Sequence, residues 1–220
     1  GGYPVVVEQK LLKDMVRQTI FAVSVNDSKV VHTGVKFEVT QNLIRLVAVD
    51  GSRLAMRTES ISYMGDDLSF VVPAKTLNEV TKLIGDDEET VSLGVGKRHI
   101  VFEIGNYSIV SRLLDGEFLN YKIAIPPTCT STAIVNTREM IESIDRTSLI
   151  ITDKFKSPVR FIFDNDIVRI SSVTALGTAN DSFNCKYEGN KIEIGFNNKL
   201  LLDALKVCDA DEVKIELNSG

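Results

Sequence analysis

Few residues of this chain have a type that could carry catalysis, and their spacing does not favour it. The sequence of 220 residues contains two histidines, His32 and His99, and neither stands at a recognisable spacing from a serine, cysteine or acidic partner. Nucleophilic and general acid–base catalysis need such a partner to activate or orient the reacting group. A lone histidine is more often structural, so we expect no catalytic residues.

The remaining polar residues do not indicate metal or phosphate binding. Four aspartates are expected in turns, and none lies on a defined metal-binding scaffold: Asp50, Asp115, Asp164 and Asp166. The cysteines are widely scattered and form no CxxC pair: Cys129, Cys185 and Cys208. Residues 94–97, GVGK, lack the spacing and the following helix of a phosphate-binding loop. We therefore expect no metal and no cofactor.

Charge and hydropathy restrict the partners and the location. The formal net charge of −5 argues against a protein that coats itself with nucleic acid, but it permits contact through one basic face. No apolar run approaches the roughly 18 residues needed to span a bilayer, and no signal peptide is expected. With its scattered cysteines, the chain is expected in a reducing, cytoplasmic setting.

Binding side chains would be positioned by short strands and amphipathic helices. Apolar residues at helical spacing predict helices over residues 9–24, 74–84, 137–151 and 199–208. Strands are predicted over residues 5–7, 35–40, 43–49, 57–61, 68–72, 90–95, 99–104, 107–113 and 213–217. The third helix would be capped by Asn136 or Thr137, and the fourth by Asn197 or Asn198.

Basic side chains follow the outer faces of these helices. They are Lys10, Lys13 and Arg17, then Lys75 and Lys82, then Arg138, Arg146, Lys199 and Lys206. Glu142, Asp145 and Asp203 dilute the charge in the later helices. A weakly positive face can hold phosphates without reading bases, but ordinary solvated helix faces would look the same.

The sequence also repeats itself. Residues 158–172 lie over residues 34–48 without a gap, at a constant offset of 124 that pairs Phe37 with Phe161 and Arg45 with Arg169. The same offset would pair Val91 with Ile215. We expect two duplicated domains of class α+β, over residues 1–127 and 128–220, each with two helices packed on antiparallel sheet. The second domain is expected to stop before its last strands, which would leave an unpaired edge.

Three separated motifs carry a resemblance. VDGSRLAM at residues 49–56 contains a predicted turn, because Gly51 tolerates positive φ and Asp50 can bond its own backbone. This motif, DGEFLNY at residues 115–121 and KIEIGFNNKLLLDAL at residues 191–205 resemble segments of the bacterial DNA polymerase III β subunit. The resemblance implies a DNA-clamp fold and the middle and most of the C-terminal domain of a replicative sliding clamp. Members of this family are processivity factors that close as homodimeric rings around duplex DNA.

The resemblance also implies a binding site for partner proteins. In the family, a hydrophobic cleft between the middle and last domains binds QLxLF-type peptides of the polymerase, the clamp loader and repair proteins. The matching positions are His32, Val49, Gly51, Ser52, Arg53, Leu54, Leu119, Ile123, Ala124, Asn197 and Leu200. His32 replaces a leucine, which would place a polar group on the rim, and Leu119 stands where proline is usual.

Leu149 and Ile150 match the family's subunit interface. Without the family's first domain, this chain is expected to be monomeric. Any polymerase activity would belong to the holoenzyme and not to this chain. The alternative to a clamp is a non-catalytic, β-rich protein-interaction module without a role on DNA, which would have neither the peptide cleft nor the basic helix face.

Overall fold

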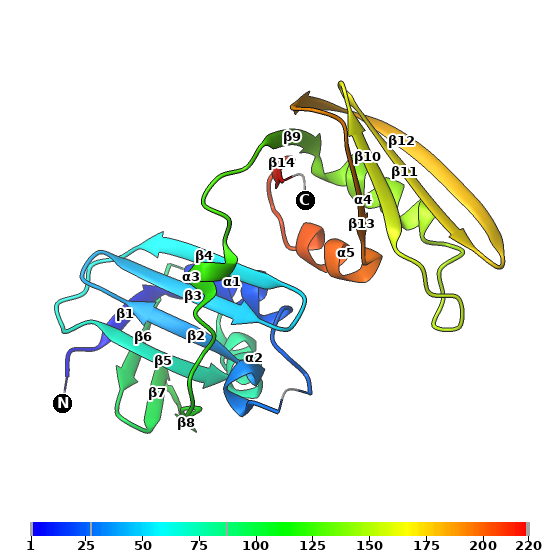
Figure 1. The fold of residues 1–220 in the computed structure, drawn as a ribbon. Helices are drawn as coiled ribbons and strands as arrows, with labels where there is room; N and C mark the ends of the chain where they lie inside the picture. Colours follow the sequence, from blue (N-terminus) through cyan, green and yellow to red (C-terminus); the bar gives the residue numbers. More distant parts are fainter. Residues whose placement is uncertain (1, 27, 87, 219–220) are drawn as a thin grey trace. The chain divides into compact units, whose positions relative to one another are not determined.

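The computed structural model describes residues 2–26, 28–86 and 88–218, and it divides into two compact units (Figure 1). Unit 1 covers Gly1–Ala124 and unit 2 covers Ile125–Gly220. The division therefore falls slightly before the expected boundary between residues 127 and 128. Of the predicted domains, residues 1, 27, 87, 219 and 220 lie outside the described residues.

Unit 1 combines two antiparallel sheets. One has the order β1–β6–β7–β8, with bounds Val5–Glu8, Thr90–Val95, His99–Ile104 and Tyr107–Arg112. The other has the order β4–β3–β2–β5, with bounds Leu54–Ser60, Leu43–Val49, Gly34–Val39 and Leu68–Pro73. Helix α1 (Gln9–Ile20) contacts strands of both sheets and also α2 (Ala74–Leu83). Their apolar side chains form one core, in which Leu12, Phe37 and Phe102 are fully buried.

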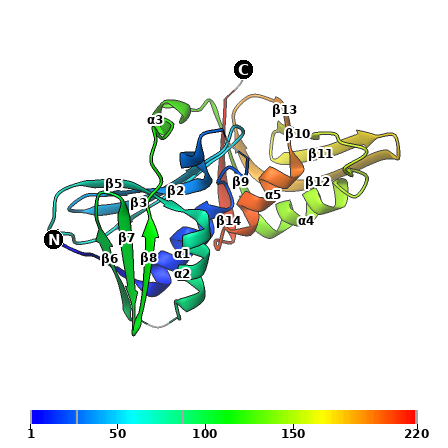
Figure 2. The same ribbon diagram turned by 90° about the horizontal axis from the view of Figure 1, so that it is seen from below.

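Short segments complete unit 1. A 3-10 helix, η1 (Val30–Thr33), precedes β2, and a short helix, α3 (Tyr121–Ala124), follows β8 along the chain. Figure 2 shows α3 on one side of the sheet that contains β2 and β3, and α1 and α2 on the other side. We call the side with α3 the outer face of this sheet.

Unit 2 contains one continuous antiparallel sheet. Its order is β13–β10–β11–β12–β9–β14, with bounds Ile192–Phe196, Val159–Asp164, Ile167–Thr174, Gly177–Glu188, Ser131–Asn136 and Glu212–Leu217. The long strand β12 pairs with β11 from Gly177 to Asn184 and then with β9 from Cys185 to Glu188. Helices α4 (Thr137–Thr147) and α5 (Asn198–Lys206) contact each other, and α4 packs on the sheet. Strand β14 lies at the sheet edge.

The expected α+β class and the duplication are confirmed by the register of the strands. Phe37 pairs with Leu46 and Phe70 in unit 1, and Phe161 pairs with Ile170 and Ile194 in unit 2. These pairs keep the offset of 124 residues found in the sequence.

The offset changes at the two ends of the repeat. Val7 pairs with Val91, and at the same place in unit 2 Val135 pairs with Val213. The predicted match of Val91 with Ile215 is therefore wrong by one inward-facing position along the strand. The cause is a difference in loop length, because strand register is set by pairing and not by sequence spacing.

Two helices end earlier than their apolar periodicity predicts. The predictions extended to residues 24 and 151, whereas α1 ends at Ile20 and α4 at Thr147. In both helices a buried threonine hydroxyl donates to the carbonyls three and four residues before it, Thr19 to Val16 and Met15, and Thr147 to Ile144 and Ser143. Such bonds compete with the helical ladder near a helix end.

Candidate functional site

The signature motif VDGSRLAM forms the connection between β3 and β4. Asp50 Oδ1 accepts hydrogen bonds from the backbone amides of Ser52 and Arg53, at 2.7 and 2.9 Å. The Asp50 amide donates to the carbonyl of Arg53 at 3.1 Å. Gly51 is not among the glycines with positive φ, so the predicted reason for this glycine is wrong. The aspartate side chain alone accounts for the turn.

Arg53 ties this turn to the end of α1. Its Nε lies 3.0 Å from Asp50 Oδ2, and its Nη2 donates to the carbonyl of Phe21 at 2.8 Å. The guanidinium also lies 5.4 Å from the centroid of the Phe21 ring. Arg53 is half-buried, and it connects the hairpin turn to the residue that follows α1.

Residues 115–124, which we call the strap, lie against the outer face of the sheet in unit 1. The strap residue Tyr121 forms a small apolar cluster with Val47 and Val49, to which Leu54 and Phe118 contribute partly buried side chains. This cluster is separate from the main core of unit 1. The strap thus joins two of the motifs, DGEFLNY and VDGSRLAM, that are far apart in the sequence.

His32 fastens the strap. Its Nε2 accepts a hydrogen bond from the Leu119 amide at 3.2 Å, and its ring contacts the Phe118 ring edge-on at a centroid distance of 5.2 Å. The side chain was expected to place a polar group on a rim, but His32 is only 9% exposed. The hydrogen bond accounts for this burial, because Nε2 accepts from the Leu119 amide and therefore points into the protein.

A polar network holds Tyr121 in place, and neither Glu38 nor Arg45 was among the predicted site residues. The Tyr121 hydroxyl donates to Glu38 Oε1 at 2.5 Å, and Arg45 Nη1 donates to the same hydroxyl at 3.3 Å. Burial raises the pKa of Tyr121, and the hydrogen bond to Glu38 adds to this effect. Lys36 Nζ lies 5.5 Å from the Phe118 ring centroid and 5.7 Å from that of Tyr121. Polar residues at outward positions of β2 and β3 were the available signal.

The predicted cleft residues of unit 1 differ in exposure, and Arg53 and Leu54 are half-buried. Leu119 and Ile123 are 47% and 80% exposed, and Gly51, Ser52 and Ala124 are also exposed. Val49, in contrast, is 2% exposed beneath Tyr121. The exposed group can contact a partner directly, whereas Val49 and His32 support the surface from within.

The predicted cleft residues of unit 2 lie at the start of α5. Asn197 caps this helix, and its Oδ1 accepts hydrogen bonds from the amides of Lys199 and Leu200 at 3.0 and 3.2 Å. Leu200 is half-buried. Asn197 also lines an open pocket of about 670 Å³ together with residues of the loop that precedes β10.

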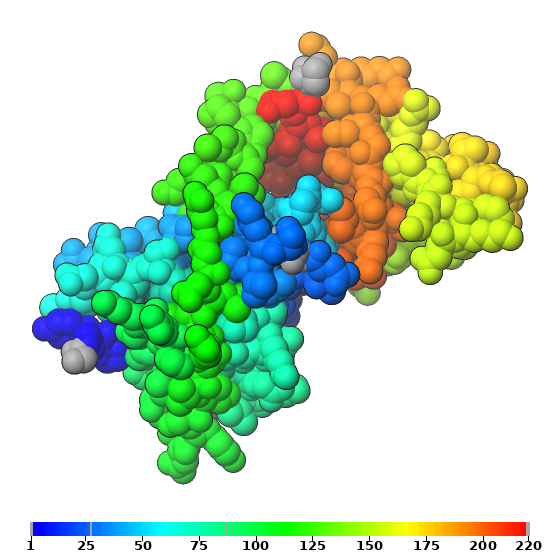
Figure 3. All heavy atoms as spheres, turned by 60° about the horizontal axis from the view of Figure 1, so that its bottom comes forward, coloured from blue at the N-terminus to red at the C-terminus, as the bar shows by residue number. Residues whose placement is uncertain are grey.

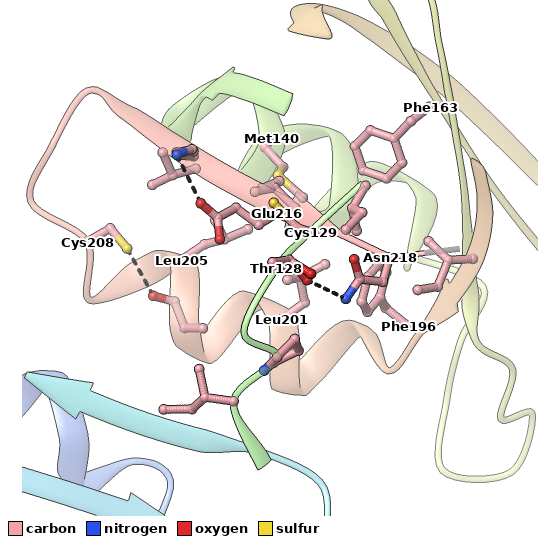
Figure 4. A pocket seen from close by; sticks show the side chains of 18 residues that line it. Thr128, Cys129, Met140, Phe163, Phe196, Leu201, Leu205, Cys208, Glu216 and Asn218 are labelled. Carbon is pink, nitrogen blue, oxygen red and sulfur yellow. Dashed lines mark hydrogen bonds and ion pairs between the residues drawn. The ribbon is translucent and has the colours of Figure 1, made fainter. Parts of the chain in front are cut away.

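Unit 2 contains a second, more apolar pocket that the sequence did not indicate. It has a volume of about 600 Å³ and lies beside β14 and α5 (Figure 4). Met140, Phe163, Phe196, Leu201 and Leu205 contribute to its walls. Asn197 and Leu200 are not among its lining residues, but their chain neighbours Phe196 and Leu201 are.

The predicted DNA-facing side chains lie on helices, and several of them are close to carboxylates. The pairs are Lys13–Asp86 at 3.5 Å, Arg17–Asp14 at 3.7 Å, Lys82–Glu79 at 3.1 Å and Arg138–Glu142 at 3.5 Å. Lys10, Lys75, Lys199 and Lys206 are exposed. Exposed pairs of this kind are weak, so these cations stay available to a stronger anion.

Arg146 differs from the other predicted DNA-facing cations. Its Nη2 lies 2.6 Å and its Nε 2.9 Å from Asp181 Oδ2, which also accepts a hydrogen bond from Ser143 at 2.8 Å. Burial opposes ionisation of Asp181, but the bonds from Ser143 and Arg146 outweigh it and lower the pKa of this carboxyl. Arg146 therefore attaches α4 to β12.

Leu149 and Ile150, the predicted interface residues, follow α4. Leu149 is 80% exposed, and the carbonyl of Ile150 accepts a hydrogen bond from Thr174 Oγ1 at 3.0 Å. That bond connects the segment to the end of β11, where Val173 is 63% exposed and Leu176, just beyond the strand, is 58% exposed. The sequence analysis did not include Val173 and Leu176.

Within the described ranges, no group of three or more His, Cys, Asp and Glu side chains is arranged to hold a metal ion. A search of the same residues finds no helix with the length and apolar character to cross a membrane.

Two family descriptions match the two units. "DNA polymerase III beta subunit, central domain" matches residues 6–120, and "DNA polymerase III beta subunit, C-terminal domain" matches residues 122–220. The chain is 31% identical over 209 residues to the "Beta sliding clamp" of Staphylococcus aureus strain Mu50, covering 94% of this chain and 55% of that protein. It is 33% identical over 214 residues to that of Halalkalibacterium halodurans, covering 94% and 56%. The chain thus spans about half the length of the curated relatives it matches.

Solved structures agree with this assignment. A putative DNA polymerase III beta subunit from Eubacterium rectale has a TM-score of 0.94 and 33% identity, covering 98% of this chain and 59% of that one. The DNA polymerase sliding clamp from Bacillus subtilis has a TM-score of 0.94 and 30% identity, covering 98% and 58%. With both units matched in chain order and in fold, the chain belongs to the family of the DNA polymerase III beta subunit, the β sliding clamp.

Proposed function

We propose that this chain is the middle and C-terminal part of a bacterial sliding clamp that tethers the replicative polymerase to duplex DNA through a peptide-binding cleft. The observation that carries this proposal is the strap, which presents Leu119 and Ile123 as exposed apolar side chains beside the signature hairpin. Large apolar side chains held on a fixed backbone are suited to binding the leucine and phenylalanine of a QLxLF-type peptide.

The peptide site would take its polar contacts from the same region. Gly51 and Ser52 are exposed at the hairpin, and Asn197 and Leu200 of unit 2 are the further residues that we propose for peptide contact. The apolar pocket of unit 2 lies beside β14, the counterpart of β6. In unit 1, β6 pairs with β7, whose Ile100 and Phe102 are fully buried. We propose that a strand paired with β14 would cover this pocket, as β7 covers the core beside β6.

DNA would be contacted by the helices. The candidates are Lys10, Lys13, Arg17, Lys75, Lys82, Arg138, Lys199 and Lys206, with Arg146 in a mainly structural role. Long, mobile cations in weak pairs can follow phosphates without fixing a register, which a sliding protein requires.

The ring would close through the segment after α4. Leu149 and Ile150 match the family's subunit interface, and Val173 and Leu176 extend the same apolar surface. In this proposal the chain supplies no chemistry of its own. The polymerase, the clamp loader and repair proteins are its partners, and the bacterial cytoplasm is its location.

The proposal is tested by fluorescence anisotropy with a labelled QLxLF-type peptide. The peptide is titrated with this chain and with a chain extended to the length of its relatives. We expect saturable binding that a peptide with alanine at its leucine and phenylalanine positions does not show. Absence of binding to both chains would overturn the peptide site and leave only the fold.

A matched pair of substitutions locates the site. Ile123→Ser removes an exposed strap side chain, and Val110→Ser removes a side chain that is 65% exposed on β8. We expect only Ile123→Ser to weaken binding, by about tenfold, since a desolvated anchor contributes more than about 1.4 kcal/mol. Equal effects of both changes would contradict the proposed location.

A further inference from the structure

The strap is fastened to the sheet where its motif residues Phe118 and Tyr121 meet side chains of β2 and β3 that the family motifs do not include. Tyr121 donates to Glu38, Arg45 donates to Tyr121, and Lys36 lies against the rings of Phe118 and Tyr121. Arg45 is itself fixed by a hydrogen bond from its Nε to Thr58 Oγ1 at 2.8 Å. We call Glu38, Arg45 and Tyr121 the clasp.

The clasp is largely buried, and Glu38 and Tyr121 also line an open pocket together with Leu119. Tyr121 is 2% exposed. The side chains of Glu38 and Arg45 are 20% and 25% exposed. The strap itself is on the surface, and Figure 3 shows the green segment that follows β8 lying beside the blue residues around η1. Ile123 does not line that pocket, so a partner can bind Ile123 without contacting the clasp.

The second copy of the fold shows that the sheet does not require the clasp. Pairing register places Ile162 at the position of Glu38, and Ser182 at the position of Thr58. Val173 stands at the position of Val49, and it is 63% exposed where Val49 is 2% exposed. Unit 2 forms its β10–β11–β12 strands without this network, so the network serves the strap.

We propose that Glu38, Arg45 and Tyr121 are positioning residues for peptide recognition, which hold the strap so that Leu119 and Ile123 face the partner. This inference rests on the proposed function. A buried hydroxyl shared between a carboxylate and a guanidinium has one favourable geometry, because each charged partner fixes a hydrogen-bond direction. The clasp therefore reduces the ordering cost that a loose strap would add to binding.

The clasp itself is tested without a peptide. Lys122 is exposed within the strap, so trypsin cleavage after Lys122, followed by mass spectrometry, reports strap opening. Arg45→Ala is expected to accelerate this cleavage several-fold at a temperature well below its thermal midpoint. Arg169→Ala is the matched control, because it removes the same residue type at the same repeat position. Equal cleavage rates for both variants and the unsubstituted chain would overturn the clasp.

Peptide binding supplies the second readout. Tyr121→Phe removes only the hydroxyl and keeps the apolar cluster, so it carries the test even where Arg45→Ala fails to fold. We expect Tyr121→Phe to lower the affinity for the labelled peptide about three- to tenfold, through faster dissociation. Arg169→Ala should bind the peptide with unchanged affinity. Unchanged peptide affinity in Tyr121→Phe and Arg45→Ala would overturn the positioning role.

Failure of the proposed function gives a different pattern. The unsubstituted chains would then not bind the peptide, while Arg45→Ala still accelerates cleavage after Lys122. That result would overturn the peptide part of the inference and retain the clasp as a fastening of the strap.

Discussion

Arg146 on α4 and Asp181 on β12 are joined through two guanidinium nitrogens, Nε at 2.9 Å and Nη2 at 2.6 Å from the same carboxylate oxygen. Unit 1 has a tie at the corresponding place with different chemistry, where Arg57 on β4 donates to Gln18 on α1 at 2.7 Å. The arginine belongs to the strand in unit 1 and to the helix in unit 2, but both units have a polar contact between the helix and the strand. Such a contact belongs to the fold.

Replacement of Arg146 should therefore affect stability more than DNA binding. We expect Arg146→Ala to lower the free energy of unfolding by about 1 kcal/mol, since the pair is partly exposed but leaves a carboxylate without its partner. Urea denaturation measures this change. Arg138→Ala, whose side chain is 89% exposed, is the control and should change stability by less than about 0.5 kcal/mol. A large loss of DNA affinity in Arg146→Ala at unchanged stability would return Arg146 to the DNA-facing group.

The same pair should make the protein sensitive to acid. The pKa of Asp181 is lowered in the folded state, so the folded protein binds this proton less readily than the unfolded chain does. Its contribution to stability is present above the ordinary aspartate pKa of about 4 and is lost as the pH falls through the lowered value. Urea denaturation from pH 6 to pH 2.5 should show a smaller loss for Asp181→Asn than for the unsubstituted chain. Parallel curves would exclude this linkage.

Gly51 offers a way to separate folding from recognition. It lacks positive φ, and no atom lies within 4 Å of the position of an added Cβ. Gly51→Ala should leave the free energy of unfolding unchanged or raise it by about 0.5 kcal/mol. It should lower the affinity for the peptide if the partner contacts the backbone at Gly51. Gly105 also has open space but a φ of 56°, so Gly105→Ala should cost about 1 kcal/mol and leave peptide binding intact. Normal peptide affinity in Gly51→Ala would remove Gly51 from the site.

Asn197 combines two roles that substitution can distinguish. Asn197 caps α5, so Asn197→Ala should lower the free energy of unfolding by about 1 kcal/mol. Asn197→Asp should keep the cap. If its amide also contacts the peptide, Asn197→Asp should bind weakly at normal thermal midpoint. Asn136→Ala removes the equivalent cap of α4, outside the predicted cleft, and should lower the midpoint without affecting the peptide. Tight binding by Asn197→Asp would limit Asn197 to capping.

The repeated core was predictable from the sequence because burial leaves a regular signature. Phe37 and Phe161 stand at the same place in two copies, and the offset of 124 residues held through β2 to β5 and α2. The offset failed at β6, where loops of different length change the numbering but not the pairing. The predicted helix ends were wrong near Thr19 and Thr147. There a threonine hydroxyl competes with the backbone hydrogen bonds of the helix, and the apolar periodicity does not reveal this bond.

The clasp and the role of His32 were beyond sequence reasoning. Each depends on contacts between residues far apart in the chain, such as His32 with Leu119 and Glu38 with Tyr121. The structure brings the strap and the hairpin, which carry two of the family motifs, into contact, whereas their role in one binding site stays a prediction. The family motifs did not indicate which side chains face outward and which hold the others in place.

The long strand β12 gives the two units different mechanical properties. In unit 2 backbone hydrogen bonds run without interruption from β13 to β14, because β12 belongs to both halves of the sheet. In unit 1 the corresponding halves are separate sheets, which meet through side chains in the core. Unit 2 should therefore resist shear as a single plate, whereas unit 1 can yield along the seam between its sheets. We therefore expect unit 1 to deform more readily than unit 2.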